Sequence, residues 1–221
     1  MKSSQTIQLK KYITLLLSWN QKLNLISKND EGFLFEKHLE DSLELTKFLK
    51  PKSDQKLLDL GTGGGIPGIP LAVFYPNLKI TLLDSTEKKI NVVSAIISEL
   101  KLENTQTICE RIEKLGHDEN FREQFDFVTA KALAPLPTLL EYAIPFLKTK
   151  GLLIAYKGTN FQEEIEKSKN ALKLLQAKII KIHEYELKNN FGKRTIIVIE
   201  KIDKTPNNYP RRTGVPTKNP L

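Results

Sequence analysis

The chain has 221 residues, of which 40% are hydrophobic and 27% are charged, and its formal net charge is +8. This composition is ordinary for a soluble globular protein of one main domain with a small appendage. No apolar run approaches the roughly 20 residues that a membrane-spanning helix needs, so we expect no membrane contact and a cytoplasmic location. Cys109 is the only cysteine, which excludes an intrachain disulfide. We expect it to be buried on a strand, and the scattered histidines predict no metal site.

The N-terminal region, residues 1–52, has the spacing of apolar residues that is typical of amphipathic helices. The first apolar face consists of Leu9, Tyr12, Ile13, Leu16 and Leu17. A second helix is expected after Asn29 and Asp30, which are favourable N-cap residues, and Pro51 ends it. His38 lies among charged residues. We interpret it as a structural or surface residue, because a catalytic histidine needs a positioned partner.

Strands and helices alternate from residue 53 to residue 202. Strands are expected at 56–60, 79–84, 104–109, 125–130, 151–157, 178–187 and 194–201, and helices at 67–75, 86–101, 134–147 and 161–176. Alternating strands and helices predict an α/β fold with a parallel, doubly wound sheet. The last two strands have no helix between them, and residues 189–193 make a hairpin turn. We therefore expect a mostly parallel, seven-stranded sheet with a C-terminal antiparallel hairpin.

The terminal segment, residues 203–221, is basic and rich in proline. It contains Lys204, Arg211, Arg212 and Lys218 against Asp203 alone, and its prolines are Pro206, Pro210, Pro216 and Pro220. The prolines exclude a regular helix or a central strand. Two interpretations stay open at this point: a disordered tail, or an extended arm along a partner or over the active site.

A glycine-rich stretch follows the first predicted strand and precedes a proline-marked helix start. Glycines let a ligand approach the backbone closely, and a helix N-terminus offers free N–H groups, so this stretch predicts a nucleotide-type cofactor site. One template is the dinucleotide fingerprint G-x-G-x-x-G, over residues 63–68, with Asp84 about 20 residues further on. The other is an acid followed by G-x-G-x-G, here Asp59, Gly61, Gly63 and Gly65.

Three observations favour the second template, the usual first motif of S-adenosylmethionine (SAM) methyltransferases. The acid inside the first strand belongs to it, and the first glycine of the dinucleotide alignment falls two residues late. SAM lacks a pyrophosphate, so its loop need not form a full phosphate cradle. The closing hairpin belongs to the methyltransferase sheet. We therefore predict a Rossmann-like class I SAM-dependent methyltransferase with SAM as cofactor. A NAD-dependent oxidoreductase is the alternative.

The other cofactor contacts are expected beyond the carboxyl ends of the strands. The end of the second strand is placed for the ribose hydroxyls, and the segment after the third strand for the adenine. Asp59 is placed to support the loop or to meet the amino group of the methionine moiety. The methyl donor is expected to meet its acceptor after the fourth strand. The residues in question, after the second, third and fourth strands, are Asp84, Ser85, Thr86, Ile112, Glu113 and Lys131.

Several motifs along the chain also match one known family. They are Trp19-Asn20 with Asn24-Leu25, residues 59–71 with the continuation Ile66-Pro67-Gly68-Ile69-Pro70-Leu71, Leu83-Asp84-Ser85 with Lys88-Lys89, Ala130-Lys131-Ala132-Leu133-Ala134, Lys157-Gly158, Lys193-Arg194 and, in part, residues 209–216. On these residues the chain resembles the RsmG/GidB methyltransferases of bacterial 16S ribosomal RNA.

The resemblance implies methyl transfer from SAM to N7 of a guanine in 16S rRNA, with the small ribosomal subunit as partner. It also implies SAM contacts at Gly61, Ile66, the turn at 84–86, Ile112-Glu113 and Lys131. The family usually has Arg where this chain has Lys131, which keeps the charge and loses the bidentate fork. No obligatory protein partner is expected, and a monomer is predicted.

Guanine N7 carries an in-plane lone pair and no proton, so no general base is required. We therefore expect no acid or base catalyst, and Lys131 and Arg194 are positioning candidates. Lys157, Arg194, Arg211 and Arg212 are the candidates for RNA contacts. A non-catalytic ribosome-binding protein on the same fold is a further alternative.

Overall fold

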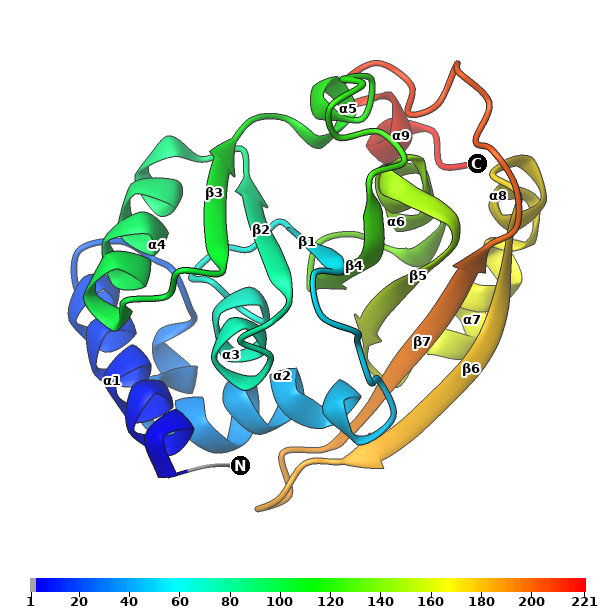
Figure 1. Ribbon diagram of the computed structural model, residues 1–221. Helices are drawn as coiled ribbons and strands as arrows, with labels where there is room; N and C mark the ends of the chain where they lie inside the picture. Colours follow the sequence, from blue (N-terminus) through cyan, green and yellow to red (C-terminus); the bar gives the residue numbers. More distant parts are fainter. Residues whose placement is uncertain (1–2) are drawn as a thin grey trace.

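The computed structural model describes residues 3–221, so the predicted N-terminal region begins two residues before the described part. Its centre is a seven-stranded sheet in the order β3-β2-β1-β4-β5-β7-β6. The neighbours from β3 to β5 are parallel, and β7 pairs antiparallel with both β5 and β6 (Figure 1). The strands are β1 Lys56–Leu60, β2 Lys79–Asp84, β3 Thr105–Cys109, β4 Phe125–Lys131, β5 Leu147–Lys157, β6 Ala177–Glu186 and β7 Lys193–Lys201. The predicted fold class is confirmed.

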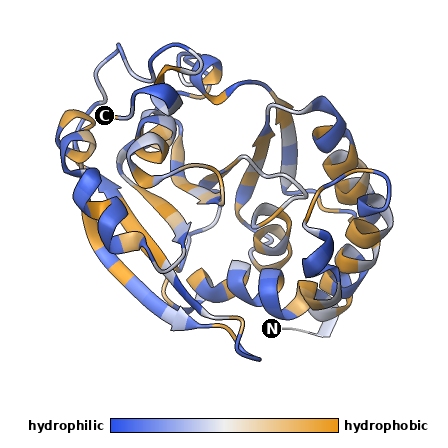
Figure 2. Cartoon of the chain, turned by 180° about the vertical axis from the view of Figure 1, so that it is seen from behind, coloured by the Kyte–Doolittle hydropathy of each residue, from blue (hydrophilic) through white to orange (hydrophobic). Residues whose placement is uncertain are grey.

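Alternate side chains of the central strands enter two separate cores. Leu57 belongs to the core on one face of the sheet and Leu58 to the core on the other, because successive residues of a strand point to opposite faces. Both faces are covered by helices, and most residues of the central strands are apolar (Figure 2).

The N-terminal helices and two helices of the sheet domain cover the first face. These are α1 Ser3–Asn20, α2 Glu40–Leu43, α3 Gly68–Phe74 and α4 Glu87–Leu100. Leu9, Leu16 and Leu45 share a core with Leu57 and Ile196, so the N-terminal region packs directly on the sheet. The second helix predicted there is a series of short turns: a 3₁₀ turn Lys28–Phe33, a π turn Phe35–Leu39, α2 and a 3₁₀ turn Glu44–Lys47.

The second face is covered by α5 Ile112–Leu115, α6 Leu136–Ala143, α7 Phe161–Lys167 and α8 Lys169–Leu174. Two helices are shorter than predicted. The one expected at 134–147 ends in a 3₁₀ turn, Ile144–Phe146, that contains Pro145, because proline cannot continue the hydrogen-bond ladder of a helix. The one expected at 161–176 is interrupted at Ser168, whose hydroxyl donates to the Glu164 carbonyl at 2.7 Å.

The tail is folded onto the second face and ends in a short helix, α9 Val215–Lys218. It passes α5 and α6, and the C-terminus lies beside α9 (Figure 1). Thr205 and Pro216 are buried. Of the two interpretations that the sequence left open, the structure shows the ordered arm.

One expectation about burial is wrong. Cys109 is exposed, because β3 is the edge strand of the sheet and only its inner side is paired. Within residues 3–221, none of the helices has both the length and the apolar character that crossing a bilayer demands.

Candidate active site

The glycine-rich loop leaves β1 at the carboxyl edge of the sheet and takes a conformation that favours glycine. Gly61, Gly63 and Gly65 have φ values of +67°, +58° and +92°. A Cβ on Gly61 would lie 2.6 Å from Leu133, and one on Gly65 would lie 2.5 Å from Ile69. Larger residues would therefore be strained at all three positions and would also clash at two of them.

The carboxylate of Asp59 stabilises this loop through hydrogen bonds. Its Oδ2 accepts hydrogen bonds from the Thr62 hydroxyl at 2.7 Å and from the Gly68 N–H at 3.0 Å, and its Oδ1 accepts one from the Thr129 hydroxyl at 2.9 Å. The side chain is fully buried, and this burial, opposed by the three hydrogen bonds, raises the pKa of Asp59 to about 6. Of the two roles expected for this acid, the contacts fit support of the loop.

Tyr12 ties the N-terminal helix to the same loop. Its hydroxyl donates to the Gly64 carbonyl at 2.9 Å across 52 residues of sequence. Burial, with the nearby charge of Asp59, raises the pKa of Tyr12 well above its usual value, so the group stays a neutral donor.

Asp84 ends β2 beside the loop, and both of its carboxylate oxygens accept backbone hydrogen bonds. Oδ2 accepts from the Gly63 N–H at 3.0 Å, and Oδ1 accepts from the Thr86 N–H at 2.9 Å. Each carboxylate oxygen has a second lone pair, so the group keeps acceptor capacity for hydroxyl groups of a ligand.

A cavity of 510 Å³ opens along the carboxyl edge, between the loop and α5. The structure brings seven of the predicted cofactor residues to its lining: Gly61, Gly63, Asp84, Ser85, Thr86, Ile112 and Glu113. Leu133 and Pro135 supply apolar surface opposite them. The remaining predicted residues, Asp59, Gly65, Ile66 and Lys131, are not among those that line this cavity.

The groups that line this cavity suit a nucleoside cofactor. An acceptor carboxylate stands at the end of β2, apolar side chains are available for a flat base, and the glycine backbone can be approached closely. Metal binding has no comparable support, since residues 3–221 contain no group of three or more His, Cys, Asp or Glu side chains arranged to hold a metal ion.

A second cavity, of 410 Å³, adjoins the first through the segment 132–135, which lines both. Its charged lining comes from Asp41, Lys131, Lys157, Glu164 and Arg194, and Tyr156 adds an aromatic ring. Three cationic and two acidic side chains therefore surround a space next to the cofactor cavity, which leaves a formal excess of one positive charge. This is the arrangement expected for an anionic or base-containing acceptor.

Lys131 is held in the second cavity by the N-terminal region. Its ammonium lies 2.6 Å from Asp41, which is 2% exposed, and 3.3 Å from Nδ1 of His38. Tyr185 of β6 donates its hydroxyl hydrogen to the other oxygen of Asp41. Three segments far apart in the sequence thus meet at one lysine.

His38, which the sequence indicates to be a structural or surface residue, contacts the predicted site residue Lys131. Burial and the charge of Lys131 lower the pKa of its imidazole, against the opposing effect of Asp30. The neutral ring accepts at Nδ1 from Lys131 and donates from Nε2 to Asp30 at 3.3 Å, which fixes the tautomer through its partners.

Lys157 and Arg194 differ in the hydrogen bonds and ion pairs that they already make within the chain. The Lys157 ammonium donates to Glu164 at 2.6 Å and to the Ala134 carbonyl at 2.8 Å, and burial lowers its pKa. The Arg194 guanidinium donates to the Lys193 carbonyl at 3.0 Å, and within residues 3–221 it makes no ion pair. Arg194 therefore has more donors free for a ligand.

The two tail arginines lie outside both cavities. Arg211 is paired with Glu141 on α6, whereas Arg212 is exposed. Sequence reasoning missed Asp41 and Tyr185 altogether, because no local motif marks side chains that meet Lys131 only after folding.

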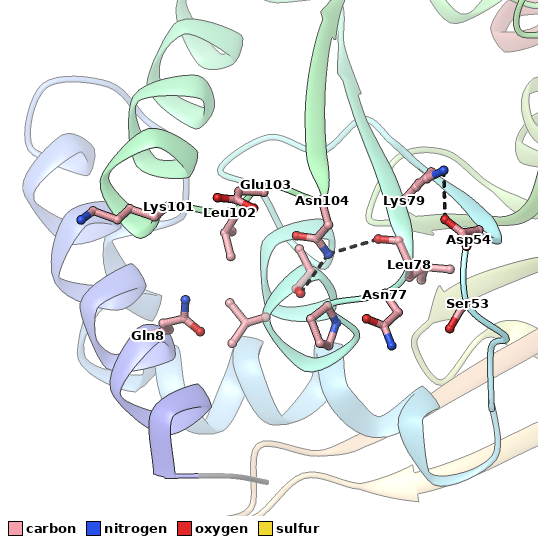
Figure 3. Close-up of a pocket in the computed structure, with 13 residues that line it drawn as sticks. Gln8, Ser53, Asp54, Asn77, Leu78, Lys79, Lys101, Leu102, Glu103 and Asn104 are labelled. Carbon is pink, nitrogen blue, oxygen red and sulfur yellow. Dashed lines mark hydrogen bonds and ion pairs between the residues drawn. The ribbon is translucent and has the colours of Figure 1, made fainter.

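Another cavity, of 640 Å³, lies at the opposite, amino-terminal edge of β2 and β3 (Figure 3). Asn104 donates there to the carbonyl oxygens of Ala72 and Leu78, and Lys79 pairs with Asp54 at 3.0 Å. These contacts join the loop before β3 to α3 and to the loop before β2, and the start of β2 to the loop before β1. Ligands of open α/β sheets bind at the other edge, so we do not assign this cavity to the site.

Comparison with known proteins finds one family whose members resemble this chain over most of its length. The family described as GidB, rRNA small subunit methyltransferase G, matches residues 5–196. A relative from Thermoanaerobacter sp. (strain X514) is 44% identical over 211 residues, which are 96% of this chain and 88% of the relative. One from Streptococcus pyogenes serotype M5 is 44% identical over 221 residues, 99% of this chain and 92% of the relative. Both are named ribosomal RNA small subunit methyltransferase G.

Solved structures share the fold at low sequence identity. M. jannaschii TYW2, in complex with AdoMet, aligns with a TM-score of 0.59 at 18% identity, over 76% of this chain and 77% of that one. TrmN from Thermus thermophilus aligns with a TM-score of 0.55 at 16% identity, over 74% of this chain and 48% of that one. These likenesses agree with the Rossmann-like α/β architecture.

Proposed function

The chain belongs to the rRNA small subunit methyltransferase G family, and from this premise we propose that it transfers a methyl group from SAM to N7 of a guanine in 16S rRNA. Family membership supports the SAM-dependent methylation of small-subunit rRNA. The choice of N7 is the finer part of the proposal. The observation that carries methyl transfer to an RNA base is the pair of adjoining cavities, one suited to a nucleoside cofactor and one with more cationic than acidic side chains.

We propose that SAM is held in the cavity of 510 Å³. Asp84 would accept from the ribose hydroxyls, and Ile112 would pack on the adenine. Gly61 and Gly63 would let the ligand approach the loop backbone, with Ser85 and Thr86 beside it. When bound, this cofactor supplies an electrophilic methyl group on a sulfonium centre.

The guanine acceptor would occupy the second cavity. Its N7 and O6 are both acceptors on the major-groove edge, and N7 carries a lone pair without a proton, so the chain need not supply a base. Lys131 has three N–H donors, of which two are taken by Asp41 and His38. The third, or a donor of Arg194, can hold O6 and leave N7 free.

Positioning is then the main contribution of the protein. Holding two reactants in line can lower a barrier by roughly 7–11 kcal/mol. Lys157 and Arg194 would bind RNA phosphates near the opening, where cationic side chains fix the register of the substrate. We also propose that the protein acts in the cytoplasm, where its ribosomal substrate is, and that it acts as a monomer. Residues 53–202 would form the methyltransferase domain.

Transfer of a labelled methyl group from SAM to purified small subunits and to naked 16S rRNA tests the proposal. We expect incorporation into at least one of the two, with ribosomes from a strain that lacks this chain as the unmethylated substrate. SAM binding without incorporation into either would favour the alternative of a non-catalytic ribosome-binding protein. Binding of NAD in place of SAM would favour the oxidoreductase.

A further inference from the structure

The C-terminal tail, residues 203–221, lies against the cofactor cavity and is outside the part of the chain that the family match covers. In Figure 1 its red helix α9 is beside α5 and α6, the helices at the carboxyl edge of the sheet. We propose that this tail is a wall of the cofactor site and that Arg211 positions it there. The proposal rests on the function proposed above.

Arg211 attaches the tail to α6 through a buried carboxylate. Its Nε and Nη2 donate to the two oxygens of Glu141 at 2.9 and 2.7 Å, and its backbone N–H donates to the same group at 2.7 Å. Glu141 is 0% exposed. A planar guanidinium matches a carboxylate with two parallel hydrogen bonds, which fixes orientation as well as position.

A second group of contacts compensates for the prolines of the tail. Proline offers a carbonyl oxygen but no N–H, so the first part of the tail needs donors from elsewhere. Arg122 donates to the carbonyls of Thr205, Pro206 and Tyr209 at 2.9, 3.2 and 2.8 Å. The path of the tail is thus set by side chains of the methyltransferase domain.

The last part of the tail reaches the cofactor cavity itself. Glu113 accepts from the Gly214 N–H at 3.0 Å, and the hydroxyls of Tyr142 and Thr217 are 2.9 Å apart. Thr217 and Pro220 line the same cavity as Gly61 and Asp84. Glu113, expected from the sequence to meet the cofactor, is therefore also a point of attachment for the tail.

These contacts give Arg211 a role different from the RNA contact predicted for it. Its fork is used to hold the tail, and through the tail it places Thr217 and Pro220 at the cavity. Because coupling between sites is reciprocal, a docked tail that tightens SAM binding must itself be held more firmly when SAM is bound.

The experiment compares SAM affinity, by calorimetry on the full-length chain, among Arg211→Ala, Arg211→Lys and the control Arg212→Ala. We expect Arg211→Ala to weaken SAM binding by at least about fivefold, the lower end of usual coupling between linked sites. Arg211→Lys keeps the charge without the fork and should fall between Arg211→Ala and the wild type. Arg212 is exposed, so its variant should bind SAM like the wild type.

The rate of cleavage by trypsin is a second measurement. If the tail had only a structural role, SAM would not change this rate. SAM should slow cleavage after Arg212 in the wild type, and the protection should be lost in Arg211→Ala. Equal SAM affinity in Arg211→Ala and wild type, or cleavage that does not depend on SAM, would overturn the inference. Failure of the wild type to bind SAM would instead refute the proposed function.

Loss of Arg211 leaves Glu141 buried without its partner, and the variant can fail to fold. Thr217→Trp tests the same wall without disturbing that pair, since Thr217 is exposed and lines the cavity. Its control is Lys218→Trp, at the next residue, which does not line the cavity. We expect at least about fivefold weaker SAM binding for Thr217→Trp alone. Equal affinities for the two tryptophan variants would contradict the proposal.

Discussion

Replacement of Asp59 by asparagine should separate support of the loop from contact with the cofactor. The carboxylate is fully buried and accepts three hydrogen bonds, from Thr62, Gly68 and Thr129. An asparagine can accept from Thr62 and Gly68 with its carbonyl oxygen. Its amide can donate to the Thr129 hydroxyl, which is free to rotate. The variant therefore keeps the contacts of the loop and removes a buried charge.

The size of the effect follows from the pKa of Asp59, which is raised from 3.8 to about 6. The folded protein binds this proton more tightly than the unfolded chain does. The contribution of the group to the free energy of unfolding is therefore greatest below pH 3.8 and is lost as the pH rises through about 6. At 1.36 kcal/mol per pKa unit the loss is about 3 kcal/mol. Asparagine does not ionise, so Asp59→Asn should not lose this stability and should be about 1–3 kcal/mol more stable than the wild type at pH 7.5.

Urea unfolding at pH 5 and pH 7.5, with SAM titration at pH 7.5, measures both roles. We expect the stability advantage of Asp59→Asn to grow between the two pH values and SAM affinity to change by less than about threefold, or roughly 0.7 kcal/mol. Asp59→Ala is the contrasting variant, because it leaves the Gly68 N–H unpaired and should lose about 1–3 kcal/mol. An Asp59→Asn variant less stable than the wild type at pH 7.5, or one that binds SAM tenfold more weakly, would refute the role of Asp59 as a support of the loop.

The other predictions concern the loop and the second cavity. Gly63→Val places a branched side chain at φ +58° on the cavity wall, so calorimetry should detect no SAM binding, and the backbone strain of about 1–3 kcal/mol should lower the melting temperature without unfolding the protein; unchanged affinity would exclude this loop from the site. Asp41→Asn removes the charge partner of Lys131 and should lower kcat while SAM affinity stays within about threefold; equal losses in both would point to general misfolding. Arg194→Ala should weaken RNA binding and reduce its salt slope by about one unit; Lys178→Ala, on β6, is the control, and equal slopes for the two would contradict the RNA contact.

Much of the fold could be predicted because its signals are local. Leu57, Leu58 and Leu60 form an apolar run that only Asp59 interrupts and that ends at glycines. Apolar residues also recur at helical spacing around Ile90 and Val93. Periodicity of this kind reports burial on a sheet or a helix face directly. The strand ends were predicted less well, since β5 begins at Leu147 rather than at 151.

The cofactor cavity could be predicted for the same reason, because the loop at 61–65 and Asp84 follow consecutive strands at one edge of the sheet. The residues around Lys131 could not. Asp41 and Tyr185 meet there across 144 residues of sequence, and a buried ion pair leaves no periodic signal. Cys109 was misjudged because the order of the strands, which exposes β3, cannot be deduced from the pattern of its own residues.

The composition of the tail does not predict that the tail is ordered. Four prolines and a net positive charge are typical of disordered segments, and they gave no indication of the pair between Arg211 and Glu141. The buried acid lies 70 residues earlier, on α6. Its burial is favourable only because the arginine reaches it in the folded chain.

The central claim, methylation of guanine N7, is tested most directly by mapping the modified nucleotide. Small subunits from a strain that lacks this chain are incubated with the purified protein and SAM, and the 16S rRNA is treated with borohydride and aniline, which cleave RNA at 7-methylguanosine. We predict one new cleavage site at a guanine, absent when SAM is omitted and absent with Gly63→Val. Methyl incorporation without such cleavage, or cleavage that does not depend on the protein, would contradict the account.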